Sequence, residues 1–297
     1  MAPINSSPTI PPDARPASRI RVLRADFLLM VLLAAAPPLA YAPAWTAGRL
    51  LAPGDGTALH LPLRAEVWRA WSRGDVPSWN GSSFSGTPLL ASYRPGALHP
   101  LTVALTPLAP FTAFQALVLL SLALTGPLLF LYTRRLGADP VGALVAGIGF
   151  VLGPYLTAHL GDTAAVVAAP ALPLVLLAAE AHLARARPAT AASLALAVAL
   201  LLLAGSPEAV GAAALLLAAR LLFAFLVPPR GADGGAAGRG ALALSTGASL
   251  LAGGLLAAPQ LLPTLVAWRE AGPGSGSPAR RAHEAVPRAR CPRGHPW

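Results

Sequence analysis

Charged side chains are scarce in this sequence. They make up 11% of its 297 residues, whereas hydrophobic residues make up 55%. Soluble domains carry roughly 25% charged residues, and the mean hydropathy of this chain is +0.60. The shortage of charge argues against an ordinary soluble domain and predicts an integral membrane protein, with the lipid bilayer as its first partner.

Lysine is absent and cysteine occurs once. The 22 basic residues are all arginines, and against 12 acids they give a net charge of +10. The single Cys291 excludes an internal disulfide framework and a Cys-rich zinc site. A pI near 11.4 would suggest nucleic-acid binding. The arginines, however, stand in short clusters at the ends of apolar runs, so we expect no nucleic-acid partner.

Apolar runs are abundant. They lie at residues 26–45, 111–132, 140–155, 163–182, 188–204, 209–227 and 240–258. A membrane-spanning helix needs about 20 predominantly apolar residues, so the pattern predicts an all-α polytopic transmembrane bundle of about seven spans within residues 25–271. The first run could also be read as a cleaved signal peptide, but Pro37, Pro38 and the long basic region before it favour an uncleaved anchor.

The arginine clusters predict the orientation of the bundle. Arg134, Arg135, Arg185 and Arg187 fall on the same side as the basic N-terminus, which the positive-inside rule assigns to the cytoplasm. The polar loop at residues 45–100 is then extracytoplasmic, in a multi-pass membrane protein. Residues 1–24 are expected to be disordered, and the Arg- and Pro-rich residues 272–297 to be a disordered tail or the product of a truncation or frame shift.

The loop at residues 45–100 is the largest polar stretch between apolar runs, and it contains a predicted helix at residues 59–73. Leu63, Val67 and Trp71 share one face of this helix, whereas Arg64 and Arg69 fall on the other. Trp68 and Trp71 favour the depth of the lipid headgroups. We therefore expect an interfacial amphipathic helix, serving either as a plain anchor or as part of a site for a lipid-linked substrate.

Asp55 stands between Gly54 and Gly56, directly after the first apolar run. Glycines allow the backbone to approach a ligand closely, and a carboxylate at the membrane surface could act as a base or hold a divalent cation. An aspartate between glycines is also a common turn residue. The residues alone leave both interpretations open.

A series of short motifs runs through this loop and beyond it. The motifs are Gly54-Asp55-Gly56, His60-Leu61-Pro62, Asp75-Val76-Pro77-Ser78-Trp79-Asn80, Ser85-Gly86-Thr87-Pro88, His99-Pro100-Leu101, Gly205-Ser206-Pro207-Glu208 and Ala258-Pro259-Gln260. In order and spacing the series resembles the YfhO-type bacterial membrane proteins, which are similar in layout to the GT-C glycosyltransferases. The chain departs from that pattern at Ser206 and Glu208, where the family tends to have His and Gln, and an ordinary helix start explains both residues as well.

The resemblance implies a membrane glycosyltransferase that takes a sugar from a polyprenyl-phosphate carrier on the outer side. Asp55 would be the catalytic base or the ligand of a divalent cation such as Mg²⁺ or Mn²⁺. The implied substrate-binding set contains arginines for the phosphate, an aromatic and an amide for the sugar, and further polar groups of the motif series: Arg64, Arg69, Arg94, Trp79, Asn80, His60, Glu208 and Gln260.

Two other classes of function remain open at this point. A transporter or flippase of lipid or polysaccharide should carry ionisable residues in the middle of its spans. Arg220 lies within an apolar run, nearer its inner end, and no acid lies in the middle of one. A non-catalytic scaffold or an inactive fragment is the other alternative, because members of the resembled family are much longer.

Overall fold

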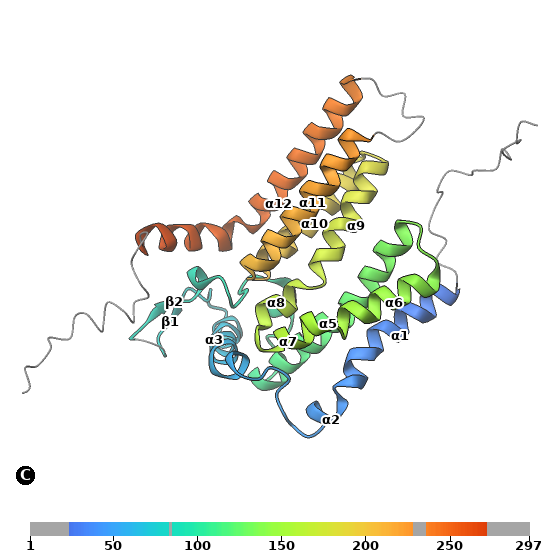
Figure 1. Cartoon of the computed structure of the whole chain (residues 1–297). Helices are drawn as coiled ribbons and strands as arrows, with labels where there is room; N and C mark the ends of the chain where they lie inside the picture. The colour runs from blue at the N-terminus through green and yellow to red at the C-terminus, as the bar shows by residue number, and fades with distance from the viewer. Residues whose placement is uncertain (1–23, 83–84, 228–235, 272–297) are drawn as a thin grey trace, which may run out of the picture.

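The computed structural model describes residues 24–82, 85–227 and 236–271, and within them the chain is mostly helical (Figure 1). The predicted disordered segments before residue 24 and after residue 271 lie outside this range. The long helices are α1 (Arg24–Ala40), α5 (Pro110–Arg135), α6 (Pro140–Val151), α9 (Ala171–Ala184), α10 (Pro188–Leu203), α11 (Pro207–Leu226) and α12 (Ala236–Ala271).

Shorter elements lie between the long helices, most of them at one end of the molecule. They are α2 (Ala42–Trp45), the π-helical turn η1 (Gly56–His60), α3 (Leu61–Ser72), β1 (Trp79–Asn80), β2 (Thr87–Pro88), the 3₁₀ turn η2 (Leu90–Ser92), α4 (Pro100–Ala104), α7 (Pro154–Ala158), the 3₁₀ turn η3 (His159–Gly161) and α8 (Thr163–Ala168). Strands β1 and β2 form a minimal antiparallel hairpin, in which Trp79 pairs with Pro88 and Asn80 with Thr87.

The long helices form two groups that diverge from each other (Figure 1). In the first group α1 packs on α5 and α6; in the second, α10 packs on α9 and α12. Helix α5 also contacts α8 and α9, which joins the groups at the end where the short elements gather. This end is the one that the arginine pattern predicts to be extracytoplasmic.

Proline and short polar caps mark where the helices begin. Proline occupies the first turn of α4, α5, α6, α7, α10 and α11, where its missing N–H costs nothing. The Asp139 carboxylate caps α6, and the Ser206 hydroxyl accepts a hydrogen bond from the Ala209 N–H at the start of α11. The ordinary helix start expected at Ser206 is therefore present.

Close helix packing in the first group depends on two glycines facing Leu33 of α1. A Cβ atom added at Gly126 of α5 would lie 3.3 Å from the Leu33 Cβ, and one added at Gly147 of α6 would lie 3.0 Å from the Leu33 Cδ1. Leu33 is fully buried at this meeting point. Small residues thus let three helices approach closely, as they do in membrane bundles.

Two ion pairs tie the helices together near the arginine-rich end. Arg134 of α5 donates a hydrogen bond to the buried Asp26 of α1, with the Nη2 and Oδ2 atoms 3.2 Å apart. Arg220 of α11 forms a bidentate pair with Glu180 of α9. Arg220, the candidate for an ionisable residue of a transporter, thus joins two helices, because its guanidinium donates to both oxygens of Glu180.

Five helical stretches among the described residues are long and apolar enough to cross a membrane. They are Pro110–Arg135, Pro140–Gly161, Thr163–Ala184, Pro207–Ala224 and Gly240–Glu270. Helix α10 is apolar but shorter, and α1 has 17 residues with two prolines inside it. The chain thus has the helices of a membrane protein, and the count of about seven spans stays a prediction.

Helix α3 lies within the stretch predicted to be helical, and its predicted apolar face packs in a core, but the side predicted to be polar is buried as well. Its position at a membrane surface stays a prediction. Arg64 and Trp68 are both buried, and the Trp68 indole donates a hydrogen bond to the Thr102 carbonyl at 2.9 Å. The indole of Trp71 donates likewise to the Ala97 carbonyl. Helix α3 is covered on two sides, by the bundle core around Trp68 and by a small core around Val67 and Leu89. Placing Arg64 on an open polar face was therefore wrong.

Gly205, in the turn between α10 and α11, has a backbone conformation and a close contact that only glycine fits. Its φ is +87°, and an added Cβ would lie 2.6 Å from the Tyr93 carbonyl oxygen. We expect Gly205→Ala to destabilise the fold by about 1–3 kcal/mol, from backbone strain and the clash together. Thermal unfolding in detergent micelles measures the effect.

Gly211 provides the matched control for this change. It lies within α11, where nothing stands within 4 Å of an added Cβ, and alanine is favoured over glycine in a helix. Gly211→Ala should leave the unfolding temperature unchanged or slightly raised. Equal effects of the two substitutions would show that the turn is not tightly packed against the Tyr93 loop.

Candidate functional site

A polar pocket of about 480 Å³ opens among the short elements at the predicted outer end. Its polar lining residues come from three separate segments of the chain: the start of η1, the segment after η2, and the η3 turn. They are Asp55, His60, Arg94, His159 and Asp162. The pocket therefore exists only because the outer loop folds back against the α7–α8 connection.

Asp162 is the central residue of this pocket. Its Oδ1 caps α8 by accepting hydrogen bonds from the Ala164 and Ala165 N–H groups. Its carboxylate also lies 3.5 Å from the His60 Nε2 and 3.5 Å from the Arg94 Nη1. The capping role can be predicted from the sequence, because aspartate often precedes an apolar helix. The contacts with His60 and Arg94 cannot, because these residues are distant in the chain.

Arg94 is presented by a tightly fastened segment. Tyr93 has φ +61°, a conformation that a bulky side chain rarely adopts. The Tyr93 hydroxyl donates to the Leu202 carbonyl at 2.7 Å, and the buried Gln260 amide binds both the Tyr93 carbonyl and the Leu98 N–H. The Arg94 Nη2 also lies 3.6 Å from the Glu208 Oε1. Glu208 is therefore connected to the pocket by an ion pair with Arg94.

Asp55 is exposed at the edge of the pocket and forms no ion pair with any described residue. Gly54 has a positive φ of +64°, and η1 lies against η3, where a Cβ added at Gly56 would be 3.3 Å from the Gly161 carbonyl oxygen. The glycines around Asp55 thus serve a turn and a close approach, and they bring its carboxylate to the pocket. The two interpretations of Asp55 are compatible.

Arg64 lies behind His60, one helical turn further along the chain, and is fully buried. Its Nη1 donates to the Thr102 hydroxyl at 3.2 Å, whereas its Nε and Nη2 have no hydrogen-bond partner among the described residues. Burial lowers the pKa of Arg64 to about 9, opposed by the Asp162 charge. The guanidinium therefore stays charged at neutral pH, with two donors to offer.

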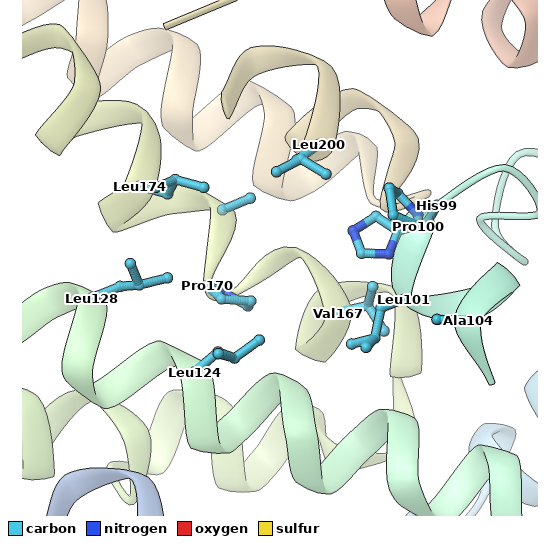
Figure 2. A pocket seen from close by; sticks show the side chains of 11 residues that line it. His99, Pro100, Leu101, Ala104, Leu124, Leu128, Val167, Pro170, Leu174 and Leu200 are labelled. Carbon is cyan, nitrogen blue, oxygen red and sulfur yellow. The ribbon is translucent and has the colours of Figure 1, made fainter. Parts of the chain in front are cut away.

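An apolar groove of about 370 Å³ begins at His99 and runs between the two helix groups. Figure 2 shows the His99 ring at one end of the groove, with Leu128 of α5 and Leu174 of α9 toward the other. Burial and the Arg64 charge together lower the pKa of His99 to about 4. Arg64 also lowers the pKa of His60, whose main cause is burial. Arg64 is thus electrostatically close to a residue of each cavity.

The structure brings together some of the residues predicted for the site. Asp55, His60 and Arg94 line the polar pocket, Arg64 lies behind it, and Glu208 contacts Arg94. The pocket also contains Asp162 and His159, which are not among the residues predicted for the site.

Four other predicted residues lie elsewhere. Arg69 is exposed and pairs with Glu66 of its own helix. The Trp79 indole is exposed and packs over Gly86 of the hairpin. Asn80 is buried, and its side chain accepts a hydrogen bond from the Ser82 N–H. The buried Gln260 amide accepts from the Leu98 N–H and donates to the Tyr93 carbonyl. The side chains of Asn80 and Gln260 thus bind backbone groups of the loop and lie outside the pocket.

Asp55 does not gain a set of metal ligands in this fold. No group of three or more His, Cys, Asp or Glu side chains within the described ranges is arranged to hold a metal ion. Asp162, the other carboxylate of the pocket, lies beside Arg94 and the His60 ring and accepts hydrogen bonds from two N–H groups. The residues present do not fit a divalent cation held by protein ligands.

The depressed pKa of His99 predicts that the fold weakens in acid. The unfolded chain binds a proton near pH 6.5 but the folded chain only near pH 4, so the stability contributed by neutral His99 is fully present above pH 6.5 and lost as the pH falls to 4. The loss is on the order of 3 kcal/mol. His99→Gln should make the unfolding midpoint fall less steeply over this interval. A slope identical to that of the unchanged protein would contradict the assignment.

Comparison with known proteins gave no relative for this chain. No protein-family model, no curated protein and no solved structure matches it. The geometry of the site and the chemistry of its residues therefore carry the functional argument.

Proposed function

We propose that this chain is an integral membrane protein of the glycosyltransferase type, which transfers a sugar from a polyprenyl-phosphate carrier on the extracytoplasmic side of a bacterial inner membrane. The observation that carries the proposal is the junction at Arg64. There a fully buried cation, with two donors that have no partner among the described residues, adds to burial in lowering the pKa of both His60, which lines the polar pocket beside Asp55, and His99, which lines the apolar groove.

The two cavities match the two halves of a lipid-linked sugar. The groove, lined by leucines, valine and prolines, suits an isoprenoid chain, and the pocket has the size typical of ligand sites, roughly 300–1,000 Å³. Between sugar and lipid such a donor carries phosphate, which guanidinium groups bind well. Arg64 and Arg94 are the arginines near this junction, whereas Arg69 lies on the open face of α3.

In the proposed reaction the Asp55 carboxylate accepts the proton of the acceptor hydroxyl. The hydroxyl oxygen attacks the anomeric carbon, and the bond between that carbon and the phosphate oxygen breaks. The electron pair leaves with the phosphate, whose developing charge is neutralised by Arg64 and Arg94. Asp162 takes no part in proton transfer because its oxygens are already bonded; it holds Arg94 and His60 in position.

Replacement of Asp55 by Asn tests the proposed base. In membranes that contain the intact chain and a polyprenyl-phosphate sugar, Asp55→Asn should lower the transfer rate by about 10²–10⁴-fold, the usual contribution of a general base. Asp75→Asn is the matched control, because Asp75 is an exposed acid of the same loop that pairs with Arg73 and lies outside the pocket. The control should transfer at the unchanged rate.

The outcomes separate the proposal from its alternatives. Equal rates for Asp55→Asn and Asp75→Asn would remove Asp55 from the chemistry. A carrier that binds but is never converted would indicate a scaffold or an inactive fragment. Movement of the intact carrier across the membrane, without loss of its sugar, would indicate a lipid transporter.

A separate prediction concerns Arg64, whose charge is buried without full pairing. Arg64→Met removes the cost of burying that charge, so the unfolding midpoint should stay the same or rise. A charged hydrogen bond contributes about 1.5–3 kcal/mol, so affinity for a polyprenyl phosphate should fall about tenfold or more. Titration calorimetry in detergent measures the binding.

Arg69→Met is the control for this change. Arg69 belongs to the same helix but is exposed and paired with Glu66, so its loss should leave carrier affinity unchanged. If the two methionine variants bind the carrier equally well, Arg64 does not bind phosphate.

A further inference from the structure

The last part of α12 takes a different direction from the rest of the helix. Figure 1 shows α12 lying along its neighbours and then turning, so that its final turns run across the end of the molecule where the short elements lie. Pro259 and Pro263 lie within the helix at this point. Proline removes a backbone donor and clashes with the preceding turn, which is the usual cause of such a bend.

Hydrogen bonds fix the position of the bend relative to the outer loop. Gln260 is fully buried, and its amide accepts from the Leu98 N–H at 3.0 Å and donates to the Tyr93 carbonyl at 3.4 Å. Helix α12 also packs on η2. Residues 261–270 therefore begin at the level of the outer loop and at the end of a helix long and apolar enough to cross a membrane.

The side chains that follow the bend are apolar and open. Leu262, Leu265, Val266 and Trp268 are between 52% and 75% exposed. The spacing of residues 262, 265 and 266 puts them on one face of the helix, which the exposed Arg269 shares at its end, with Trp268 at the edge of the face and Ala267 opposite. The exposed apolar surface continues without a break from the crossing part of α12, where Leu251 and Leu255 are as open.

We propose that residues 261–270 lie parallel to the membrane, at its extracytoplasmic surface. Their apolar face would lie at the boundary between headgroups and acyl chains. Tryptophan is enriched in that place, and the long side chain of an arginine there can extend its charge to the headgroups. The occupant of the face is lipid because the face is continuous with that of a membrane-crossing helix. Through Gln260 the segment sets the depth of residues 93–99, which carry Arg94 and His99, and so holds the mouth of the polar pocket at a fixed height above the bilayer.

Spin labels in the full-length chain, reconstituted into phospholipid vesicles, test this placement. Cys291 is replaced by serine, and single labels are introduced by Leu265→Cys and, as the matched control on the opposite face, by Ala267→Cys. The Leu265→Cys label should collide more often with oxygen, which concentrates in lipid, than with a water-soluble nickel chelate. The Ala267→Cys label should show the reverse order. A label at Leu255→Cys gives the value for the bilayer interior.

Two results would overturn the proposal. A Leu265→Cys label that favours the chelate would place the segment in water. A label shielded from both reagents would show that a second copy or another segment covers the face. Leu255 and Leu265 are exposed and Ala267 is partly buried, and each labelled protein is used only if it elutes with the unlabelled chain in gel filtration, so a change in fold cannot imitate either result.

Discussion

The Asp162 carboxylate holds the outer part of this molecule together. It caps α8, so its position is fixed by the first turn of a helix buried between the two helix groups. From there it reaches His60 of η1 and Arg94 of the segment after η2. A single side chain therefore sets the distance between two loop segments and the bundle. Because its charge is already matched by these partners, it leaves Asp55 as the carboxylate of the pocket that is open to a ligand.

The charge of Arg64, in contrast to that of Asp162, is only partly compensated and lowers the stability of the fold. A buried arginine must give up its hydration, and one hydrogen bond to Thr102 replaces only part of it. Its charge also disfavours protonation of His60 and His99. A fold selected for stability alone would place an apolar residue here. The position of this charge, between a polar and an apolar cavity, makes sense if an anionic group completes its hydrogen bonds.

Predictions from the sequence were most successful where interactions within a few residues determine the structure. Apolar runs, proline at the first turn of helices and the Ser206 cap all act within a few residues, and each appears in the structure near its predicted place. The burial of a second side of α3, which holds Arg64 and Trp68, was not predicted, because it depends on the bundle core around Trp68 and not on the loop around Leu89 that covers the predicted face. The role of Gln260 was missed for a similar reason, since its partners lie more than 160 residues away.

The same contrast explains the composition of the candidate site. Residues of the loop that face their own neighbours, such as Arg69 and Asn80, only complete local structure. Residues that face another segment, such as His60, Arg64 and Arg94, gather where the loop meets α8 and α10. A bilayer leaves few places where a charged group can lie, which agrees with a candidate site located where the loop at residues 45–100 closes over the ends of the helices. Segments that fasten this loop, including the bend of α12, therefore belong to the site as much as the residues that line it.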